Sequence, residues 1–175
     1  MLPPGGVGLK LHAVRNHRKI LREHVVINES GGILPYTCEQ AFDLAADIER
    51  YPQFLKGWIS ARLLRRECNV CYVDQVVGLG PVRLQFTSRA VLYRPERIEV
   101  TSTEAPFRLF SLLWRITPVA SAACRVGVVA EIELQSRIAQ RVVDQILPAA
   151  MDDIIVAFET RAQRVYGGAG AASRG

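Results

Sequence analysis

The chain has 175 residues, of which 49% are hydrophobic and 22% are charged, and this balance favours one globular domain with a sizeable core. Because no apolar run reaches the roughly 18 residues needed to cross a bilayer, the sequence predicts no transmembrane helix. The net charge of +5 comes from scattered arginines and not from a basic run interleaved with aromatic residues, which argues against nucleic acid as the main partner.

The two ends of the chain differ in composition from its middle. Residues 1–17 contain the structure-breaking run Pro3-Pro4-Gly5-Gly6 and carry basic but no acidic residues. Residues 168–175 consist mostly of glycine and alanine. We therefore expect a flexible basic tail over 1–17 and a flexible tail over 168–175, on either side of one folded domain over 18–167.

The first part of the domain predicts one strand and two helices. A strand is expected over residues 20–28, and Gly31-Gly32 is expected to turn the chain. Thr37 and Gln40 have the spacing of a capping box, which marks the start of a helix. Pro52 disfavours helical geometry at the residue before it, so we expect this helix to stop at Tyr51 and a short second helix to follow.

Apolar residues then recur at every second position between residues 82 and 134. The apolar sets run over residues 82–92, 98–102, 110–116 and 124–134. Turn residues separate the expected strands at 67–69, 78–81, 94–96, 105–106 and 118–122. A period of two is typical of half-buried antiparallel strands, so with the turns at 67–69 and 78–81 we expect about six strands between the second short helix and the long C-terminal helix.

The last predicted element is a long helix over residues 136–166, with apolar residues every four positions from Ile138 to Ala162. Pro148 lies inside it and is expected to bend it. Together, these elements predict an α+β helix-grip fold. In this fold a curved antiparallel sheet of about seven strands wraps around the C-terminal helix, and the two short helices close one end.

The segment from Ala46 to Leu55, ADIERYPQFL, resembles the coenzyme Q-binding START-like proteins and the polyketide cyclase/dehydrase relatives grouped with them in the SRPBCC superfamily. Shorter matches follow in order at residues 86–89, 95–98, 106–108, 114–118 and 157–162. After Leu55 the coenzyme Q-binding branch usually continues with Pro-Trp-Cys, whereas this chain has Lys56-Gly57-Trp58. The resemblance implies a helix-grip fold that binds a lipid or a quinone.

Aromatic and aliphatic side chains are the candidate walls of a cavity between sheet and helix. An apolar pocket with few polar groups suits a flat or polyprenyl ligand. The expected ligand-binding residues are Tyr51, Phe54, Leu55, Trp58, Phe86, Phe107, Phe110, Trp114, Ile146 and Ala150. Ordinary core packing is the alternative role for each of them. The candidates for polar orientation of the ligand are Gln75, Ser88, Ser102 and Arg115.

The sequence offers no catalytic or metal constellation. The three histidines, His12, His17 and His24, fall in the basic tail and the first strand, so we expect no catalytic residue. Cys68 and Cys71 form a single C-x-x-C pair, whereas a tetrahedral zinc site needs four ligands, so we expect no metal. All four cysteines are expected to be free thiols in a reducing compartment, which predicts a cytoplasmic protein.

The leading interpretation is a noncatalytic carrier of a hydrophobic small molecule, either an isoprenoid quinone such as ubiquinone or a related lipid. Such a carrier would support quinone biosynthesis or respiratory electron transport. It would contact those enzymes or the inner membrane peripherally, or work in the mitochondrial matrix if the source is eukaryotic. No cofactor is expected apart from the bound ligand.

A polyketide aromatase/cyclase is one alternative. The second is an interaction module similar to the ribosome-association toxin. The sequence leaves the oligomeric state open.

Overall fold

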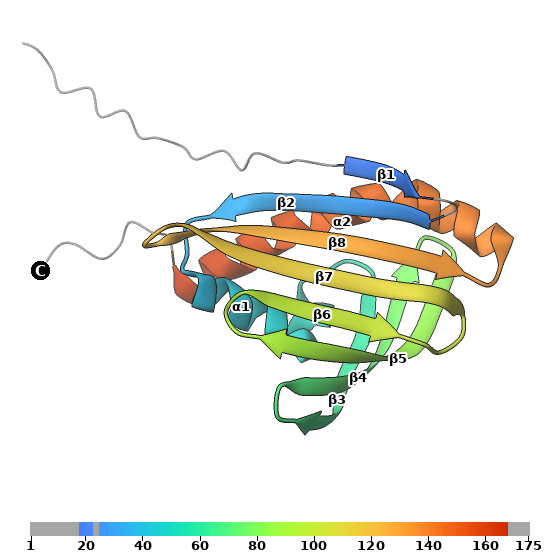
Figure 1. Cartoon of the computed structure of the whole chain (residues 1–175), viewed down its shortest axis with the longest axis horizontal. Helices are drawn as coiled ribbons and strands as arrows, with labels where there is room; N and C mark the ends of the chain where they lie inside the picture. Colours follow the sequence, from blue (N-terminus) through green and yellow to red (C-terminus); the bar gives the residue numbers. More distant parts are fainter. Residues whose placement is uncertain (1–17, 23–24, 168–175) are drawn as a thin grey trace, which may run out of the picture.

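The computed structural model describes residues 18–22 and 25–167 (Figure 1). The expected tails at 1–17 and 168–175 lie outside the described residues. In the described residues, eight antiparallel strands form one sheet in the order β1-β2-β8-β7-β6-β5-β4-β3. The strands are β1 (Arg18–Arg22), β2 (Val25–Leu34), β3 (Trp58–Glu67), β4 (Val70–Leu79), β5 (Val82–Tyr93), β6 (Arg97–Ser102), β7 (Phe107–Ala120) and β8 (Ala123–Leu134).

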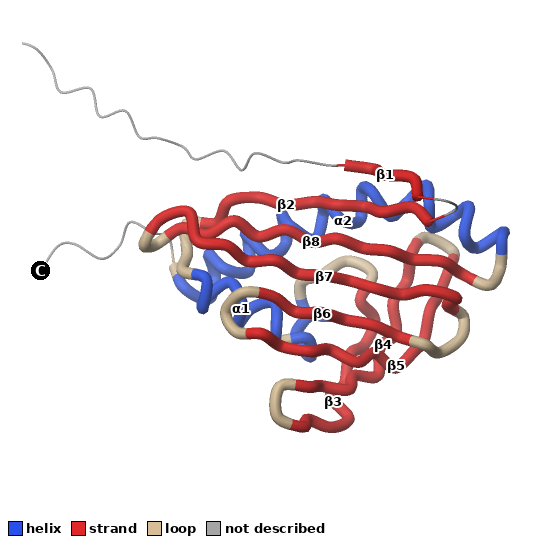
Figure 2. Tube along the Cα trace, viewed as in Figure 1, coloured by secondary structure: helices blue, strands red, loops and turns tan. Residues whose placement is uncertain are grey.

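Three helices lie on one side of this sheet: α1 (Cys38–Ala46), the 3-10 helix η1 (Ile48–Gln53) and α2 (Arg137–Tyr166) (Figure 2). The predicted capping box begins α1, because the Thr37 hydroxyl accepts a hydrogen bond from the Gln40 N–H at 3.2 Å and Gln40 Oε1 accepts from the Thr37 N–H at 3.0 Å. Ser136 caps α2 by accepting from the Ala139 N–H at 3.3 Å. The helix-grip fold predicted from the sequence is confirmed.

The long helix α2 packs on the concave face of the sheet. Its buried residues are Val143, Leu147, Met151, Ile154, Ile155, Phe158 and Ala162. A hydrogen bond of 2.7 Å from the Ser30 hydroxyl to Asp152 joins β2 to the helix. The predicted apolar stripe is wrong at its start, because Ile138 is 78% exposed. The first turn of α2 extends past the ends of the strands, so Ile138 has no sheet to pack against (Figure 1).

The predicted turn at Gly31-Gly32 is also wrong, since β2 continues through both glycines. Gly31 pairs with Gly127 on β8, and a Cβ atom at Gly31 would stand 2.7 Å from the Val126 carbonyl oxygen. Glycine therefore serves a close approach of two strands at this position and not a turn. The single strand expected over 20–28 is divided between β1 and β2, which gives eight strands in place of about seven.

A third correction concerns the predicted break at Tyr51. The α-helix already ends at Ala46, and Pro52 lies inside η1. Proline is tolerated in this short helix because the backbone N–H groups that follow it still find a hydrogen-bond acceptor. The N–H groups of Phe54 and Leu55 both donate to the Tyr51 carbonyl, at 3.1 and 2.8 Å.

Candidate ligand-binding cavity

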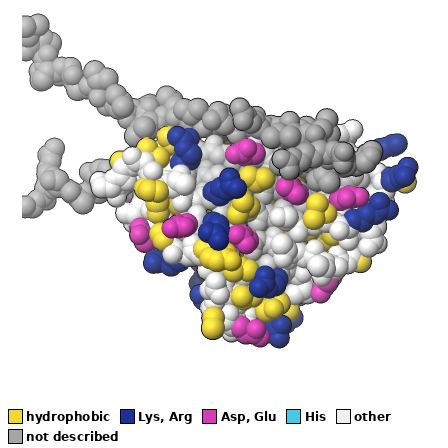
Figure 3. Space-filling view, in the orientation of Figure 1, with side chains coloured by type: hydrophobic (Ala, Val, Ile, Leu, Met, Phe, Trp, Pro, Cys, Tyr) yellow, Lys and Arg dark blue, Asp and Glu magenta, His cyan; other side chains and the backbone are white. Residues whose placement is uncertain are grey.

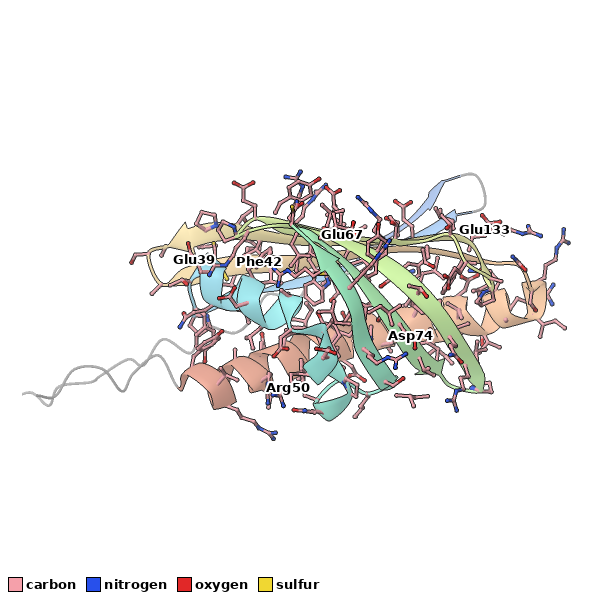
Figure 4. The ribbon with its side chains drawn as sticks, turned by 90° about the horizontal axis from the view of Figure 1, so that it is seen from below. Glu39, Phe42, Arg50, Glu67, Asp74 and Glu133 are labelled. Carbon is pink, nitrogen blue, oxygen red and sulfur yellow. The ribbon has the colours of Figure 1, made fainter. Side chains whose placement is uncertain are left out.

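A cavity of about 500 Å³ lies between the concave face of the sheet and the three helices. Strands β3 to β5 bend out of the plane of β7 and β8 toward α2, and α1 and η1 close the remaining side (Figure 4). Ligand pockets typically measure about 300–1,000 Å³. At roughly 30 Å³ for each molecule of liquid water, this volume suits a ligand of on the order of 20 non-hydrogen atoms.

Side chains along β5 to β8 alternate between the two faces of the sheet, and those on the concave face form an apolar wall of the cavity. Inward residues of these strands line it, whereas their neighbours on the other face are mostly half-buried or exposed. Phe110 and Leu112 are only half-buried although β7 is a central strand. Their remaining exposure is to the cavity, because both line it.

Aromatic rings of the cavity wall pack in two groups. Phe86, Phe107 and Phe110 form one group, with ring centroids 4.8–5.0 Å apart. In the other group, Trp114 and Tyr51 of the wall pack against Phe158 of α2, whose ring centroid lies 4.8 Å from that of Trp114 and 5.5 Å from that of Tyr51. Edge-on and tilted contacts of this kind are favourable arrangements of aromatic rings. Each wall ring is therefore supported by other rings as well as by aliphatic side chains.

A chain of hydrogen bonds crosses β3, β4 and β5 beside the cavity. The indole Nε1 of Trp58 donates to Gln75 Oε1 at 3.0 Å, and Gln75 Nε2 donates to the Ser88 hydroxyl at 2.6 Å. Gln75 and Ser88 are buried, and Trp58 and Gln75 line the cavity. Gln75 Nε2 carries a second hydrogen, which gives the apolar wall a polar donor.

Charged residues surround the opening of the cavity. Asp43, Glu49, Lys56, Arg66 and Arg94 line it together with Asp47. Arg94 holds Asp43 through two hydrogen bonds of 2.9 and 3.0 Å, and the hydrogen bond to Asp43 raises the pKa of the Arg94 guanidinium. Phe42, labelled on α1 in Figure 4, lines the apolar interior. The site thus combines a charged rim with an apolar interior.

Tyr51 connects η1 to α1. Its hydroxyl donates to the Ala45 carbonyl, and the ring is buried among other aromatic rings. Burial raises the pKa of the Tyr51 phenol well above its ordinary value, so the group stays protonated and acts as a donor. Tyr51 therefore fixes the geometry of the cavity wall and carries no charge.

The structure gathers seven of the ten residues that the sequence assigns to the ligand. Those that line the cavity are Tyr51, Trp58, Phe86, Phe107, Phe110, Trp114 and Ala150. Phe54, Leu55 and Ile146 lie outside it, in a neighbouring hollow of about 300 Å³. Phe54 and Leu55 follow η1, and together with Ile146 of α2 they line this hollow beside Gly78, Leu79 and Gly80 at the β4–β5 turn.

The structure places the four polar residues expected to orient the ligand in different surroundings. Gln75 lines the cavity and bonds to Ser88. The Ser102 hydroxyl donates to the Thr87 carbonyl at 2.7 Å and so stabilises the pairing of β5 with β6. Arg115 is exposed on the outer face of the sheet and cannot orient a ligand.

Several cavity residues were not among the sequence candidates. They include Val73 and Val77 on β4, Ile98 and Val100 on β6, Ala130 and Ile132 on β8, and Leu147, Met151 and Ile154 on α2. Their inward positions follow from the same period of two in the strands and from the buried stripe of α2. The sequence candidates were mostly aromatic residues, so most of the aliphatic part of the wall was missed.

The four cysteines are free thiols, of which Cys71 and Cys124 are buried. Cys124 on β8 and Cys38 on α1 share a hydrogen bond, and burial raises the pKa of the Cys124 thiol to about 12. Over residues 18–22 and 25–167, no group of three or more His, Cys, Asp or Glu side chains is arranged to hold a metal ion. In the same residues no helix is long and apolar enough to span a membrane.

A curved sheet gripping one long helix around an apolar cavity defines a helix-grip domain of the START-like class. The family described as polyketide cyclase/dehydrase and lipid transport matches residues 34–159, and the chain belongs to this family.

Two relatives of known name show the range of the family. The ribosome association toxin RatA of Escherichia coli is 26% identical over 134 residues, which cover 77% of this chain and 85% of the toxin. The coenzyme Q-binding protein COQ10 homolog B of Xenopus laevis is 22% identical over 139 residues, which cover 77% of this chain and 57% of that protein.

Solved structures agree with the fold. An 18 kDa protein from Caulobacter crescentus is 28% identical, with a TM-score of 0.67 over 81% of this chain and 99% of that one. The Zhui aromatase/cyclase of a Streptomyces species is 15% identical, with a TM-score of 0.75 over 84% of this chain and 99% of that one. At 15% identity this second likeness shows the fold alone.

Proposed function

We propose that the protein is a noncatalytic carrier that holds an isoprenoid quinone or a related lipid in its cavity. The observation that carries this proposal is the 500 Å³ cavity, whose interior, inside the charged rim, is lined mainly by aromatic and aliphatic side chains together with the buried amide of Gln75. Burying apolar ligand surface there yields about 25 cal/mol for each Å² removed from water. A ligand that is mostly hydrocarbon with one or two carbonyl groups fits this chemistry.

Gln75 is the group that favours a quinone over a plain hydrocarbon. Gln75 lines a cavity rich in flat rings, and its amide nitrogen has a second hydrogen beyond the one donated to Ser88, which a carbonyl oxygen could accept. Trp58 and Ser88 fix its orientation, so the donor is positioned before the ligand arrives. The relative named as a coenzyme Q-binding protein supports the same choice of ligand.

A titration with a short-chain ubiquinone tests this proposal through quenching of tryptophan fluorescence, since Trp58 and Trp114 both line the cavity. Ala130→Phe fills the interior from β8, and Thr101→Phe adds the same ring on the exposed outer face of β6. We expect binding to wild type and to Thr101→Phe, and at least tenfold weaker binding to Ala130→Phe. Equal affinity in all three proteins, with unchanged thermal unfolding, would refute the cavity as the site.

Ribosome association is a second candidate, because the match to the ribosome association toxin RatA covers 77% of this chain and 85% of that toxin. The outer face of the sheet offers a suitable surface. Arg65 stacks over the Tyr72 ring at 4.0 Å, and Arg97 stacks over the Tyr93 ring at 3.8 Å. Arginine and tyrosine side chains can stack on RNA bases.

Acidic side chains lie among the basic ones on that face, which weakens its attraction for RNA (Figure 3). Cosedimentation with purified ribosomal subunits at rising salt tests this second candidate, because phosphate contacts weaken steeply with salt. Salt-sensitive binding that Arg97→Ala reduces would favour it. The aromatase/cyclase alternative has the likeness of fold as its support.

A further inference from the structure

A second hollow lies directly behind one wall of the main cavity. It measures about 300 Å³ and is bounded by residues 54–57, the β4–β5 turn and one face of α2. Four residues, Lys56, Leu79, Ala150 and Ile154, line both spaces. The same side chains therefore form the partition between the cavity and the hollow.

The hollow has the chemistry of an apolar groove. Phe54, Leu55, Ile146, Val156 and Ala157 are among its lining residues, and Asp153 adds a carboxylate. Bare backbone forms its floor, because the Gly78 N–H donates to the Gly57 carbonyl at 2.7 Å and a Cβ atom at Gly57 would stand 2.7 Å from the Gly78 carbonyl oxygen. Glycine is required at position 57 by both this contact and its φ of +90°.

The partition is thin. Ala150 carries a single methyl group, and Leu79 is only half-buried at the end of β4. Lys56 is exposed, so its long flexible stem can move aside while its ammonium group stays in water. Ile154, the fourth residue of the partition, is buried, so a slender chain would pass beside Lys56, Leu79 and Ala150.

We propose that this hollow receives the polyprenyl chain of a ligand whose ring occupies the main cavity. The inference rests on the proposed function and deepens it by setting the length of the ligand. At roughly 30 Å³ for each water-sized volume, the main cavity holds a substituted quinone ring with about one isoprene unit, and the hollow holds about two more. Longer chains would emerge beside the β4–β5 turn.

The test compares ubiquinones with one and with four isoprene units. Ala157→Phe narrows the hollow from α2 without touching the main cavity, because Ala157 lines the hollow alone. Ala149→Phe is the matched control, since Ala149 is exposed on the same helix. Ile146→Trp narrows the hollow at a second point in case Ala157→Phe folds poorly.

We expect wild type and Ala149→Phe to bind the four-unit quinone at least tenfold more tightly than the one-unit quinone. Ala157→Phe and Ile146→Trp should lose that preference and keep their affinity for the one-unit quinone within about twofold of wild type. A preference that survives in both narrowed variants, or that wild type lacks, overturns the inference and leaves the carrier function standing. Failure of wild type to bind either quinone overturns the carrier function itself.

Discussion

Arg94 in the β5–β6 turn reaches across to Asp43 on α1, with Nε 2.9 Å from Oδ1 and Nη2 3.0 Å from Oδ2. Both residues line the cavity, so the pair joins the helix to the sheet at the rim of the site. Both side chains are about half exposed, at 54% and 52%. Such a pair adds little to stability but can hold an opening closed.

We predict that Arg94→Ala accelerates release of a bound quinone several-fold, while the free energy of unfolding falls by no more than about 1 kcal/mol. Stopped-flow fluorescence measures the release rate, and urea unfolding measures the stability. Arg97→Ala is the control, because Arg97 forms a similar exposed pair with Glu99 at 2.8 Å on β6 and does not line the cavity. Equal acceleration in both variants would contradict a gating role for Arg94.

Gln75→Leu should lower the free energy of unfolding by about 1–3 kcal/mol, because it leaves the Trp58 indole N–H without its acceptor and the Ser88 hydroxyl without its donor. It should also weaken binding of a quinone more than binding of a hydrocarbon of similar size. Gln85→Leu, at an exposed position on β5, should change stability by less than about 0.5 kcal/mol. Urea unfolding and fluorescence titration of the two variants check this, and identical results for both would count against the role of Gln75.

Gly31 and Gly127 face each other across β2 and β8 and provide a matched pair of substitutions. Gly31→Ala should cost about 1–3 kcal/mol, because its Cβ atom would stand 2.7 Å from the Val126 carbonyl oxygen. Gly127→Ala should be nearly neutral, since its Cβ atom would meet nothing within 4 Å. Thermal unfolding distinguishes the two, and a neutral Gly31→Ala would show that the strands can separate at little cost.

Stability should fall at alkaline pH. The unfolded chain releases the Cys124 proton near the ordinary thiol pKa of 9.0, whereas the folded protein keeps it until a pKa of about 12. Between these pH values the unfolded state binds fewer protons, so the free energy of unfolding decreases as pH rises. Buried Tyr51, whose pKa is also raised, adds to the decrease above the ordinary tyrosine pKa of 10.0.

Urea unfolding between pH 8 and pH 11 checks this pH dependence. Cys124→Ala should flatten the decrease, with the contribution of this one group approaching a tenfold change in the folding equilibrium for each pH unit above 9. Cys68→Ala, in the exposed β3–β4 turn, should leave the slope unchanged. A slope that is the same in both variants would mean that Cys124 does not contribute.

Much of the fold could be predicted from the sequence because burial on one side of a sheet imposes a period of two. The alternation from Val82 to Leu134 therefore predicted which side chains face inward, and the Thr37 capping box predicted the start of α1. Gly31 misled because composition alone cannot distinguish a turn from a close approach of two strands. Gly31 is needed because of its close contact with the backbone of Val126, on a strand that lies almost a hundred residues later in the chain.

The site was less predictable, because the cavity depends on how far β3 to β5 curve toward α2. Phe54 and Ile146 are apolar and lie within two residues of Lys56 and Leu147, which line the cavity, yet they line the hollow on the other side of the partition. Sequence periodicity fixes a face of an element and not its distance from other elements. Gln75 was recognised as a polar candidate, but its bonds to Trp58 and Ser88 required the register of three strands.

The most direct test of the central claim is native mass spectrometry of the protein purified from its own host, followed by organic extraction and identification of the extracted lipid. The carrier account predicts one prenylated quinone or related lipid for each chain, released on unfolding and lost in Ala130→Phe. Protein that is empty as purified, and that takes up no quinone when one is supplied, would contradict it.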